Sequence, residues 1–235
     1  VPRHLWRGAL IIVYGDDIMV DRKIKIELNN EIYDEDSVYA SIALRGGFIT
    51  KEYLIDNESS FAGSYAFYNI LFQYWRLTSS HSGIRYDVLR GKSIIAFSGK
   101  KSDYIETLKY VLEKLFSSEY NEEDFEEAKK ISRSAFTNRY KTGEFRSRLK
   151  IFEFSDLNKC FELRELISDI ETIDFDTFKS CAKTLLVPGN VHLYINGAAD
   201  NVEVVYEAVK AVLPERNHSI EVKNNFYDPY LKQDA

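Results

Sequence analysis

Cysteine, proline and histidine are scarce in this chain, and long apolar runs are missing. The two cysteines among its 235 residues, Cys160 and Cys181, cannot build the disulfide framework of a small secreted domain. Both lie in apolar, helix-like runs, which indicates buried, reduced thiols. No apolar run approaches the roughly 20 residues of a membrane span, and no signal peptide is visible. We therefore expect a protein without a membrane span in a reducing compartment, the cytoplasm.

The start of the chain leaves a second compartment open. The first residue is Val1 rather than Met, so we expect the native start to lie upstream. A targeting segment removed from that side would place the protein in the mitochondrial matrix instead.

The sparse histidines limit the chemistry that the chain can perform. None of the four lies three or four residues from another, so no helix can present two of them to one metal ion; they are His4, His81, His192 and His218. The run SSHS at 79–82 supplies neither an oriented base nor an oxyanion hole, so it is better interpreted as a turn. There is no P-loop, and no GxGxxG follows a strand. We predict no catalytic residue, no metal ligand and no cofactor.

The composition is otherwise typical of a globular domain. Hydrophobic residues make up 45% of the sequence and charged residues 29%, which is enough apolar material for a sizeable core. The chain holds 15 Phe and 16 Tyr, so we expect that core to be rich in aromatic side chains. The net charge of −6, with basic residues interspersed among acidic ones, disfavours nucleic acid as a partner.

Periodicity and turn residues divide the chain into strands and helices. We expect strands at 8–15, 23–28, 37–44, 84–89, 93–98 and 191–196. The expected helices cover 59–76, 102–115, 121–142, 144–154, 160–170, 174–187 and 200–213, with N-caps at Ser102, Asn121 and Asp174. Residues 48–57 show no period and should form a connector. This order predicts an α+β fold, a mostly antiparallel sheet of about five or six strands with helices packed mainly on one face.

Three consecutive segments and two later motifs carry a family resemblance. The run SSFAGSYAFYNILFQYWR at 59–76 is followed by GIRYDVLRGKSIIAFSG and then by SDYIETLKYVLEKLF. Further along stand EEDFEEAKK and the closing unit ELISDIETIDFDTFKSCAKTLLVPGNVHLYING. In these motifs, and in the order of helix, strand pair and helix, the chain resembles one domain of the insulinase-like, mitochondrial-processing-peptidase-like metallopeptidases.

The resemblance suggests how the chain is organised. It covers residues 23–213, which we interpret as one insulinase-like α+β domain. Residues 1–22 then hold a leading strand that could end a preceding domain, and residues 214–235 form a polar and aromatic C-terminal tail.

The zinc motif of this family is missing here. Active members carry His-x-x-Glu-His on the helix that corresponds to 59–76, and the motif occurs nowhere in this sequence. In an alignment with the zinc-bearing first domain, Tyr65, Tyr68 and Asn69 occupy its positions. Two tyrosines and an amide would not bind zinc usefully. The resemblance therefore implies a pseudo-peptidase rather than an enzyme.

An alignment with the second domain of the family points to a substrate contact instead. The segment SGIRYDVL resembles one that holds a tyrosine in contact with the substrate backbone, and this tyrosine corresponds to Tyr86. An arginine seven residues earlier in active members is replaced by Ser79. Arg76 and Arg85 lie nearby and could take its place. We therefore predict substrate binding by Tyr86, Arg85 and Arg76.

These implications combine into one functional hypothesis and one alternative. The chain would be a non-catalytic subunit that forms a peptide-binding chamber with a zinc-bearing homologue or with a second copy of itself, as a hetero- or homodimer. Peptide or precursor processing would then depend on substrate positioning by this chain. In the alternative, the chain is a structural scaffold subunit of a larger complex and binds no peptide.

Overall fold

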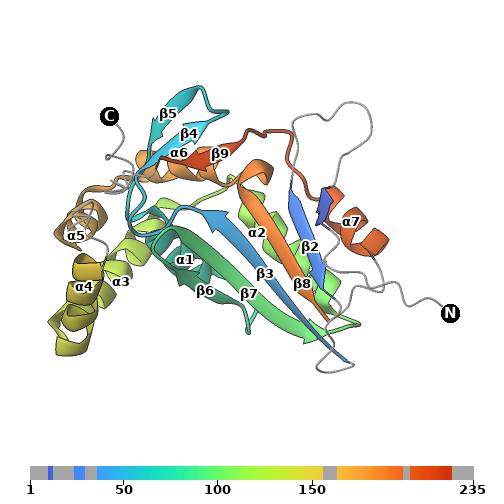
Figure 1. Cartoon of the computed structure of the whole chain (residues 1–235), viewed down its shortest axis with the longest axis horizontal. Helices are drawn as coiled ribbons and strands as arrows, with labels where there is room; N and C mark the ends of the chain where they lie inside the picture. Colours follow the sequence, from blue (N-terminus) through green and yellow to red (C-terminus); the bar gives the residue numbers. More distant parts are fainter. Residues whose placement is uncertain (1–9, 13–23, 30–35, 156–162, 198–201, 224–235) are drawn as a thin grey trace, which may run out of the picture.

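The chain folds around one large sheet and one small sheet. A computed structural model describes residues 10–12, 24–29, 36–155, 163–197 and 202–223. Within them, six strands form a sheet in the order β1-β2-β8-β3-β7-β6, and three form a sheet in the order β5-β4-β9 (Figure 1). The strands are β1 (Leu10–Ile12), β2 (Lys25–Asn29), β3 (Ser37–Arg45), β4 (Glu52–Ile55), β5 (Ser59–Ala62), β6 (Arg85–Val88), β7 (Lys92–Lys100), β8 (Val191–Asn196) and β9 (Ile220–Val222).

The pairing within the large sheet is mostly antiparallel, as expected. Only β2 and β8 run parallel, whereas β1–β2, β3–β8, β3–β7 and β6–β7 are antiparallel. Strands β3 and β8 occupy the centre, and β6 forms one edge beside β7. Strand β1 falls within the expected strand at 8–15, whose other residues lie outside the described part of the chain.

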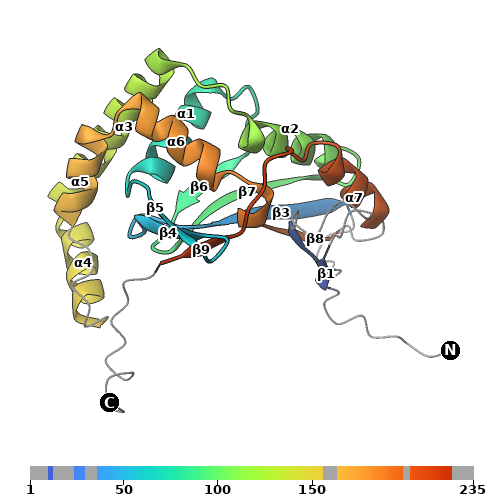
Figure 2. The same ribbon diagram turned by 90° about the horizontal axis from the view of Figure 1, so that it is seen from above.

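Helices cover one face of the large sheet. The described helices are α1 (Phe67–Thr78), α2 (Tyr104–Phe116), α3 (Glu122–Lys141), α4 (Gly143–Ser155), α5 (Leu163–Thr172), α6 (Phe175–Leu185) and α7 (Val202–Lys210). Figure 2 shows α1, α2, α3 and α6 on the same side of the sheet. Alternate residues of β3, beginning with Val38 and ending with Leu44, are buried against these helices, while their neighbours are partly or fully exposed. The expected α+β architecture is thus confirmed.

The long helix expected at 59–76 is wrong in its first half. Residues Ser59–Ala62 form β5, which pairs with β4 inside the segment expected to be a connector. The turn between the two strands places Asp56 and Asn57 at φ values of 52° and 59°. Two successive residues with positive φ are typical of a type I′ hairpin turn, which joins strands and not helical residues. Helix α1 therefore begins only at Phe67.

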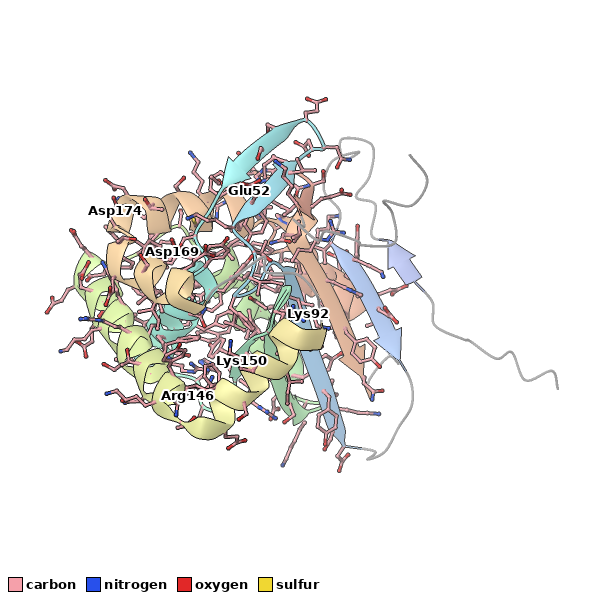
Figure 3. All side chains as sticks on the ribbon, turned by 60° about the vertical axis from the view of Figure 1, so that its left-hand side comes forward. Glu52, Lys92, Arg146, Lys150, Asp169 and Asp174 are labelled. Carbon is pink, nitrogen blue, oxygen red and sulfur yellow. The ribbon has the colours of Figure 1, made fainter. Side chains whose placement is uncertain are left out.

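Two of the three expected N-caps are confirmed. Asn121 Oδ1 accepts a hydrogen bond from the backbone N–H of Asp124 at 3.1 Å, and Asp174 Oδ1 accepts one from Thr177 at 2.7 Å. Each satisfies an amide that the first helical turn leaves unpaired. Ser102 is not a cap, because α2 begins after Asp103, whose backbone is already helical and whose side chain makes no capping bond. Asp174 lies at the periphery of the molecule (Figure 3).

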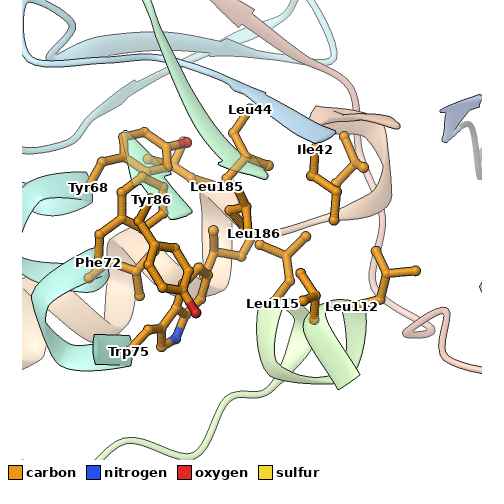
Figure 4. Close-up of a cluster of buried hydrophobic side chains, with 14 of the residues drawn as sticks. Ile42, Leu44, Tyr68, Phe72, Trp75, Tyr86, Leu112, Leu115, Leu185 and Leu186 are labelled. Carbon is orange, nitrogen blue, oxygen red and sulfur yellow. The ribbon is translucent and has the colours of Figure 1, made fainter. Parts of the chain in front are cut away.

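The core is rich in aromatic side chains, as the composition predicts. Helix α1 buries seven of its 12 residues, and its aromatic side chains meet those of α3 and α6. Phe178 of α6 is central, with ring centroids 5.5 Å from Phe67 and 5.0 Å from Phe125. Figure 4 shows the adjoining cluster, in which side chains of α1, α2, β3 and β6 converge with Leu185 and Leu186. Burial of these side chains therefore fixes α1 against the large sheet.

The remaining sequence predictions concern the thiols and the tail. Cys181 is buried, and burial raises the pKa of its thiol to about 12, so that it stays protonated. Cys160 lies outside the described residues. In the C-terminal segment, β9 (Ile220–Val222) pairs with β4 and completes the small sheet. No helix in the described part of the chain is long and apolar enough to cross a bilayer.

Candidate functional site

The three predicted site residues lie close in sequence but do not share one surface. Tyr86 on β6 faces the helices and is 7% exposed. Its neighbour Arg85 is exposed and points to the opposite face of the sheet, because side chains alternate along a strand. Arg76 lies in the last turn of α1, next to β6. The structure therefore brings Arg76 and Tyr86 together and separates Arg85 from them.

Arg76 and Tyr86 interact directly. Arg76 Nη2 donates a hydrogen bond to the Tyr86 carbonyl at 2.6 Å, and the guanidinium carbon lies 5.7 Å from the Tyr86 ring centroid. The ring also packs against Phe72, at 5.3 Å between centroids, and Trp75, at 5.9 Å (Figure 4). Burial raises the pKa of the Tyr86 phenol to about 12, so the hydroxyl stays neutral at physiological pH. The pair forms a rigid wall at the edge of the sheet.

A cavity of about 560 Å³ lies against this wall. It is bounded by α1, β6, α3 and the first turn of α4, and Phe48 closes one side. Its size lies within the range of roughly 300–1,000 Å³ that holds small ligands or a few residues of a peptide. The other aromatic residues of the lining are Phe72, Tyr86, Phe136 and Phe145, of which Phe72 and Tyr86 are almost fully buried.

Polar groups also converge on the cavity. Asn69, Gln73 and Arg76 lie three and four residues apart on α1, so they share one helix face. Arg139 on α3 adds a second guanidinium. The exposed Glu144 on α4 supplies a negative charge. Asp87 on β6 borders the cavity too, but its side chain points to the opposite face of the sheet, as that of Arg85 does.

Asn69 holds the one cavity-lining nitrogen that is buried without a hydrogen-bond partner among the described residues. Its backbone carbonyl accepts a bond from Ser132 Oγ at 3.3 Å, but its Nδ2 has no acceptor. An unpaired buried donor costs about 1–3 kcal/mol of stability. The nitrogen is shielded from solvent, so a ligand oxygen reaches it only if the amide turns toward the cavity.

Sequence reasoning missed most of this lining, although a signal was present. Helix α1 is apolar around most of its circumference, and Asn69, Gln73 and Arg76 form its polar stripe. A narrow polar stripe on a buried helix is typical of a cavity or an interface. Phe136 and Arg139 on α3 carried no comparable signal, because only the packing of α3 on α1 brings them there.

The three residues at the positions of the zinc motif lie in different surroundings. Tyr65 precedes α1, and Tyr68 lies in the core. The Tyr68 hydroxyl donates to the Arg45 carbonyl at 3.0 Å and accepts from Asn190 Nδ2 at 3.2 Å. Burial raises the pKa of this phenol far above its usual range. Only Asn69 faces the cavity. Among the described residues, no three His, Cys, Asp or Glu side chains gather closely enough to hold a metal ion.

Ser79, which stands where the sequence comparison placed an arginine, lies just past the end of α1. Its hydroxyl lies 2.9 Å from that of Tyr110 on α2. Ser79 is not part of the cavity lining. The cation that lies beside the Tyr86 ring is the Arg76 guanidinium.

No family model and no curated protein sequence matches this chain. Solved structures do share its fold. A structure described as an M16-like peptidase from Alicyclobacillus acidocaldarius has a TM-score of 0.71 at 14% identity and covers 91% of this chain and 52% of its own. The first half of the periplasmic protease PqqL from Escherichia coli has a TM-score of 0.64 at 11% identity, with coverages of 89% and 47%. A chain of Complex III2 from Candida albicans, with Inz-5 bound, has a TM-score of 0.59 at 11% identity and covers 86% of this chain and 48% of its own.

These likenesses bear on the fold. The chain has the fold of an M16-like peptidase domain and spans about half the length of the three chains that it resembles. The insulinase-like fold expected from the sequence is thereby confirmed.

Proposed function

We propose that this chain, which has the fold of M16-like peptidases, is a non-catalytic subunit that binds peptide in the cavity beside β6. It would act with a zinc-bearing homologue or with a second copy of itself. The observation that supports this proposal most directly is the cavity of about 560 Å³ with its unpaired Asn69 amide. Peptides present a backbone carbonyl oxygen at every residue, so a bound peptide offers the hydrogen-bond acceptor that Asn69 lacks.

The proposed lack of catalysis follows from the residues on α1. Cleavage of peptides by this family's chemistry needs a metal ligand set, and Tyr65, Tyr68 and Asn69 stand at the positions of the motif in this chain. Tyr68 is also committed to two hydrogen bonds in the core. The proposed contribution is positioning of the substrate, which can affect rate strongly without a catalytic group.

The proposed partner would cover the face of the large sheet that the helices leave open. In the middle of this face, Ser41 lies between Ala96 of β7 and Tyr194 of β8, and Ala43 lies beside Ile94. These side chains are partly exposed and mostly small. Tyr39 on the same face of β3 is 53% exposed. A flat, partly apolar face of this kind suits a protein partner.

Peptide binding is tested with fluorescein-labelled peptides of about ten residues, measured by fluorescence anisotropy with and without a zinc-bearing homologue. We expect Gln73→Ala and Phe136→Ala to weaken binding about tenfold, or ~1.4 kcal/mol each. Arg133→Ala is the matched control, because Arg133 lies on α3 and pairs with Glu171 outside the cavity. Absence of peptide binding in both conditions, or equal binding by all variants, would refute the proposal.

Association is tested separately by sedimentation velocity. Ser41→Arg places a long charged side chain in the centre of the open face and should abolish association with the homologue or with a second copy. Ser134→Arg introduces the same change at an exposed position of α3 and should leave association intact. If both variants associate as the unmodified chain does, the partner does not cover this face.

The alternative is a scaffold subunit. It is supported by the likeness to a chain of Complex III2, a structure of a multi-subunit assembly. A scaffold predicts association through the open face together with indifference to peptide. The two experiments therefore separate the alternatives. A scaffold subunit associates through the open face in the sedimentation experiment but shows no peptide binding in the anisotropy experiment.

A further inference from the structure

A second cluster of polar groups lies on the other side of Tyr86, where the loop after α1 meets α2. Its centre is Tyr110, whose hydroxyl lies 2.9 Å from Ser79 Oγ. Ser79 Oγ also accepts a hydrogen bond from the backbone N–H of His81 at 3.3 Å. Either hydroxyl can donate in the Ser79–Tyr110 bond, and Ser79 is the donor when the phenol is ionised. The His81 ring stacks on the Tyr110 ring, with centroids 3.8 Å apart, and holds it in place.

Lys114 lies one helical turn beyond Tyr110 and supplies a positive charge. Its Nζ donates to Thr78 Oγ1 at 3.1 Å and to the Trp75 carbonyl at 3.4 Å. These bonds to the end of α1 fix the ammonium group 5.9 Å from the Tyr110 ring centroid. A serine hydroxyl and a lysine thus flank one phenol, and both favour its anionic form.

The pKa values agree with this geometry. Burial alone would raise the pKa of Tyr110, but the hydrogen bond from Ser79 and the charge of Lys114 outweigh it and lower the pKa below its usual value. Burial lowers the pKa of Lys114, against the opposing effect of Tyr110. The other described tyrosines with a shifted pKa are all raised, chiefly by burial; they are Tyr53, Tyr68, Tyr74, Tyr86 and Tyr120.

Space for a reactant adjoins this cluster. A cavity of about 400 Å³ is lined by Tyr110 and Lys114 of α2, by Trp75 and Thr78 of α1 and by Tyr120. Tyr110 is partly exposed and lines this cavity. The lining is part aromatic and part polar, because Ser117 and the carboxylates of Glu113 and Glu119 also belong to it.

We propose that Tyr110 is a nucleophilic tyrosine that accepts an acyl group from an activated acyl donor bound in this second cavity. The Tyr110 oxygen attacks the acyl carbon and forms a C–O bond. The bond between that carbon and the leaving group then breaks, and the leaving group departs with the electron pair. The phenolic proton passes to the leaving group through solvent, so that an ester and a protonated leaving group are the products. The site is separated from the peptide cavity by Tyr86, whose phenol also interacts with Ser79 and Tyr110.

The chain contains its own matched control for this proposal. Tyr206 and Lys210 on α7 have the same spacing as Tyr110 and Lys114, and Lys210 Nζ lies 5.7 Å from the Tyr206 ring centroid. Tyr206 is also partly exposed. No hydrogen bond to the Tyr206 hydroxyl occurs among the described residues. The two pairs therefore differ in the hydroxyl groups that surround the phenol.

The test is limited acetylation with N-acetylimidazole at neutral pH, followed by peptide mapping with mass spectrometry. We expect Tyr110 to be acetylated at least ten times faster than Tyr206. Ser79→Ala and Lys114→Met should each reduce the Tyr110 rate severalfold and leave the Tyr206 rate unchanged, while Lys114→Arg keeps the charge and should retain most of the rate. Hydroxylamine removes acetyl groups from tyrosine oxygen but not from lysine nitrogen, which identifies the acceptor atom.

Two outcomes would overturn the proposal. One is equal acetylation of Tyr110 and Tyr206 in the unmodified chain. The other is a Tyr110 rate that Ser79→Ala and Lys114→Met leave unaltered. Circular dichroism of each variant shows whether α1 and α2 remain folded, and the Tyr206 rate reports on the intactness of the chain in the same sample.

Discussion

Replacement of Asn69 by leucine should stabilise the protein and weaken its proposed peptide binding. Asn69 Nδ2 is buried without a hydrogen-bond partner among the described residues, and Asn69 is part of the cavity lining. Leucine has a similar size and no polar atom, so Asn69→Leu removes the penalty of about 1–3 kcal/mol for an unpaired buried donor. Leucine also has the better helix propensity, by roughly 0.5 kcal/mol. We expect a gain of about 2 kcal/mol in the free energy of unfolding, which corresponds to a rise in Tm of roughly 4–8 °C for a chain of this size.

The assay is urea unfolding followed by circular dichroism, with thermal unfolding alongside it. The urea midpoint should rise without a change in the slope m, because the surface exposed on unfolding is nearly the same. Asn138→Leu is the control: Asn138 is exposed on α3, so this variant reports the helix-propensity gain alone. Peptide affinity, measured in parallel, should fall for Asn69→Leu and stay constant for Asn138→Leu.

Two results would refute this reasoning. If Asn69→Leu is no more stable than Asn138→Leu, the Asn69 amide is satisfied in solution and is not an open hydrogen-bond donor. If Asn69→Leu is more stable but binds peptide as before, the donor is real and the ligand does not use it. A gain in stability with a loss of binding is the pattern of a group kept unpaired for function.

Three further predictions concern packing, acid stability and metal. Tyr86→Ala should lower the free energy of unfolding by about 3 kcal/mol in urea, because it removes a ring packed on Phe72 and Trp75; Tyr86→Phe should cost little, and equal stability of both variants would contradict the packing. The hydrogen bond from Thr177 lowers the pKa of Asp174 below its usual value. Its stabilising effect should be present at neutral pH and lost as pH falls below the usual aspartate pKa and through the lower folded pKa, and Asp174→Asn should show a shallower acid transition there. The purified chain should hold no stoichiometric zinc by elemental analysis and cleave no peptide alone; about one zinc per chain, lost when histidines are replaced, would overturn the non-catalytic reading.

The strands of the large sheet could be predicted from sequence because one face is covered and the other is not. The residues of β3 and β8 alternate between buried and more exposed positions. One-sided burial imposes this alternation on the sequence, so the period of two is visible without any knowledge of the partners. The expected strand at 191–196 has the bounds that the structure shows.

The small sheet escaped prediction because its stability comes from a distant segment. Strands β4 and β5 have four residues each, too few to show a period. Strand β9, which completes the sheet, follows β4 by more than 160 residues in the chain, and no local pattern reports such a pairing. The Asp56–Asn57 turn was the local signal available, since Asp and Asn tolerate the positive φ that a type I′ turn needs.

In the candidate site, too, features set by neighbouring residues could be predicted from the sequence, and features set by packing between distant elements could not. The separation of Arg85 from Tyr86 follows from strand alternation and could have been foreseen from their adjacency. The contact between Arg76 and Tyr86 depends on how the chain returns from α1 to β6, which the nine residues between them do not specify. The contribution of α3 depends on helix packing across more than 50 residues.

The geometry indicates that α1 contributes more than Tyr86 to the binding of a ligand. The ring of Tyr86 is held by Phe72 and Trp75, and its carbonyl is held by Arg76, so these groups are already paired without a ligand. A group whose interactions are satisfied gains little from a ligand, whereas an unpaired donor gains a hydrogen bond. Asn69 is therefore better placed than Tyr86 to contribute binding energy, and Tyr86 serves as the wall that keeps the cavity open beside β6. Under the proposed function, Asn69 would donate a hydrogen bond to the peptide from a helix position at which the family resemblance implies a metal ligand in active members.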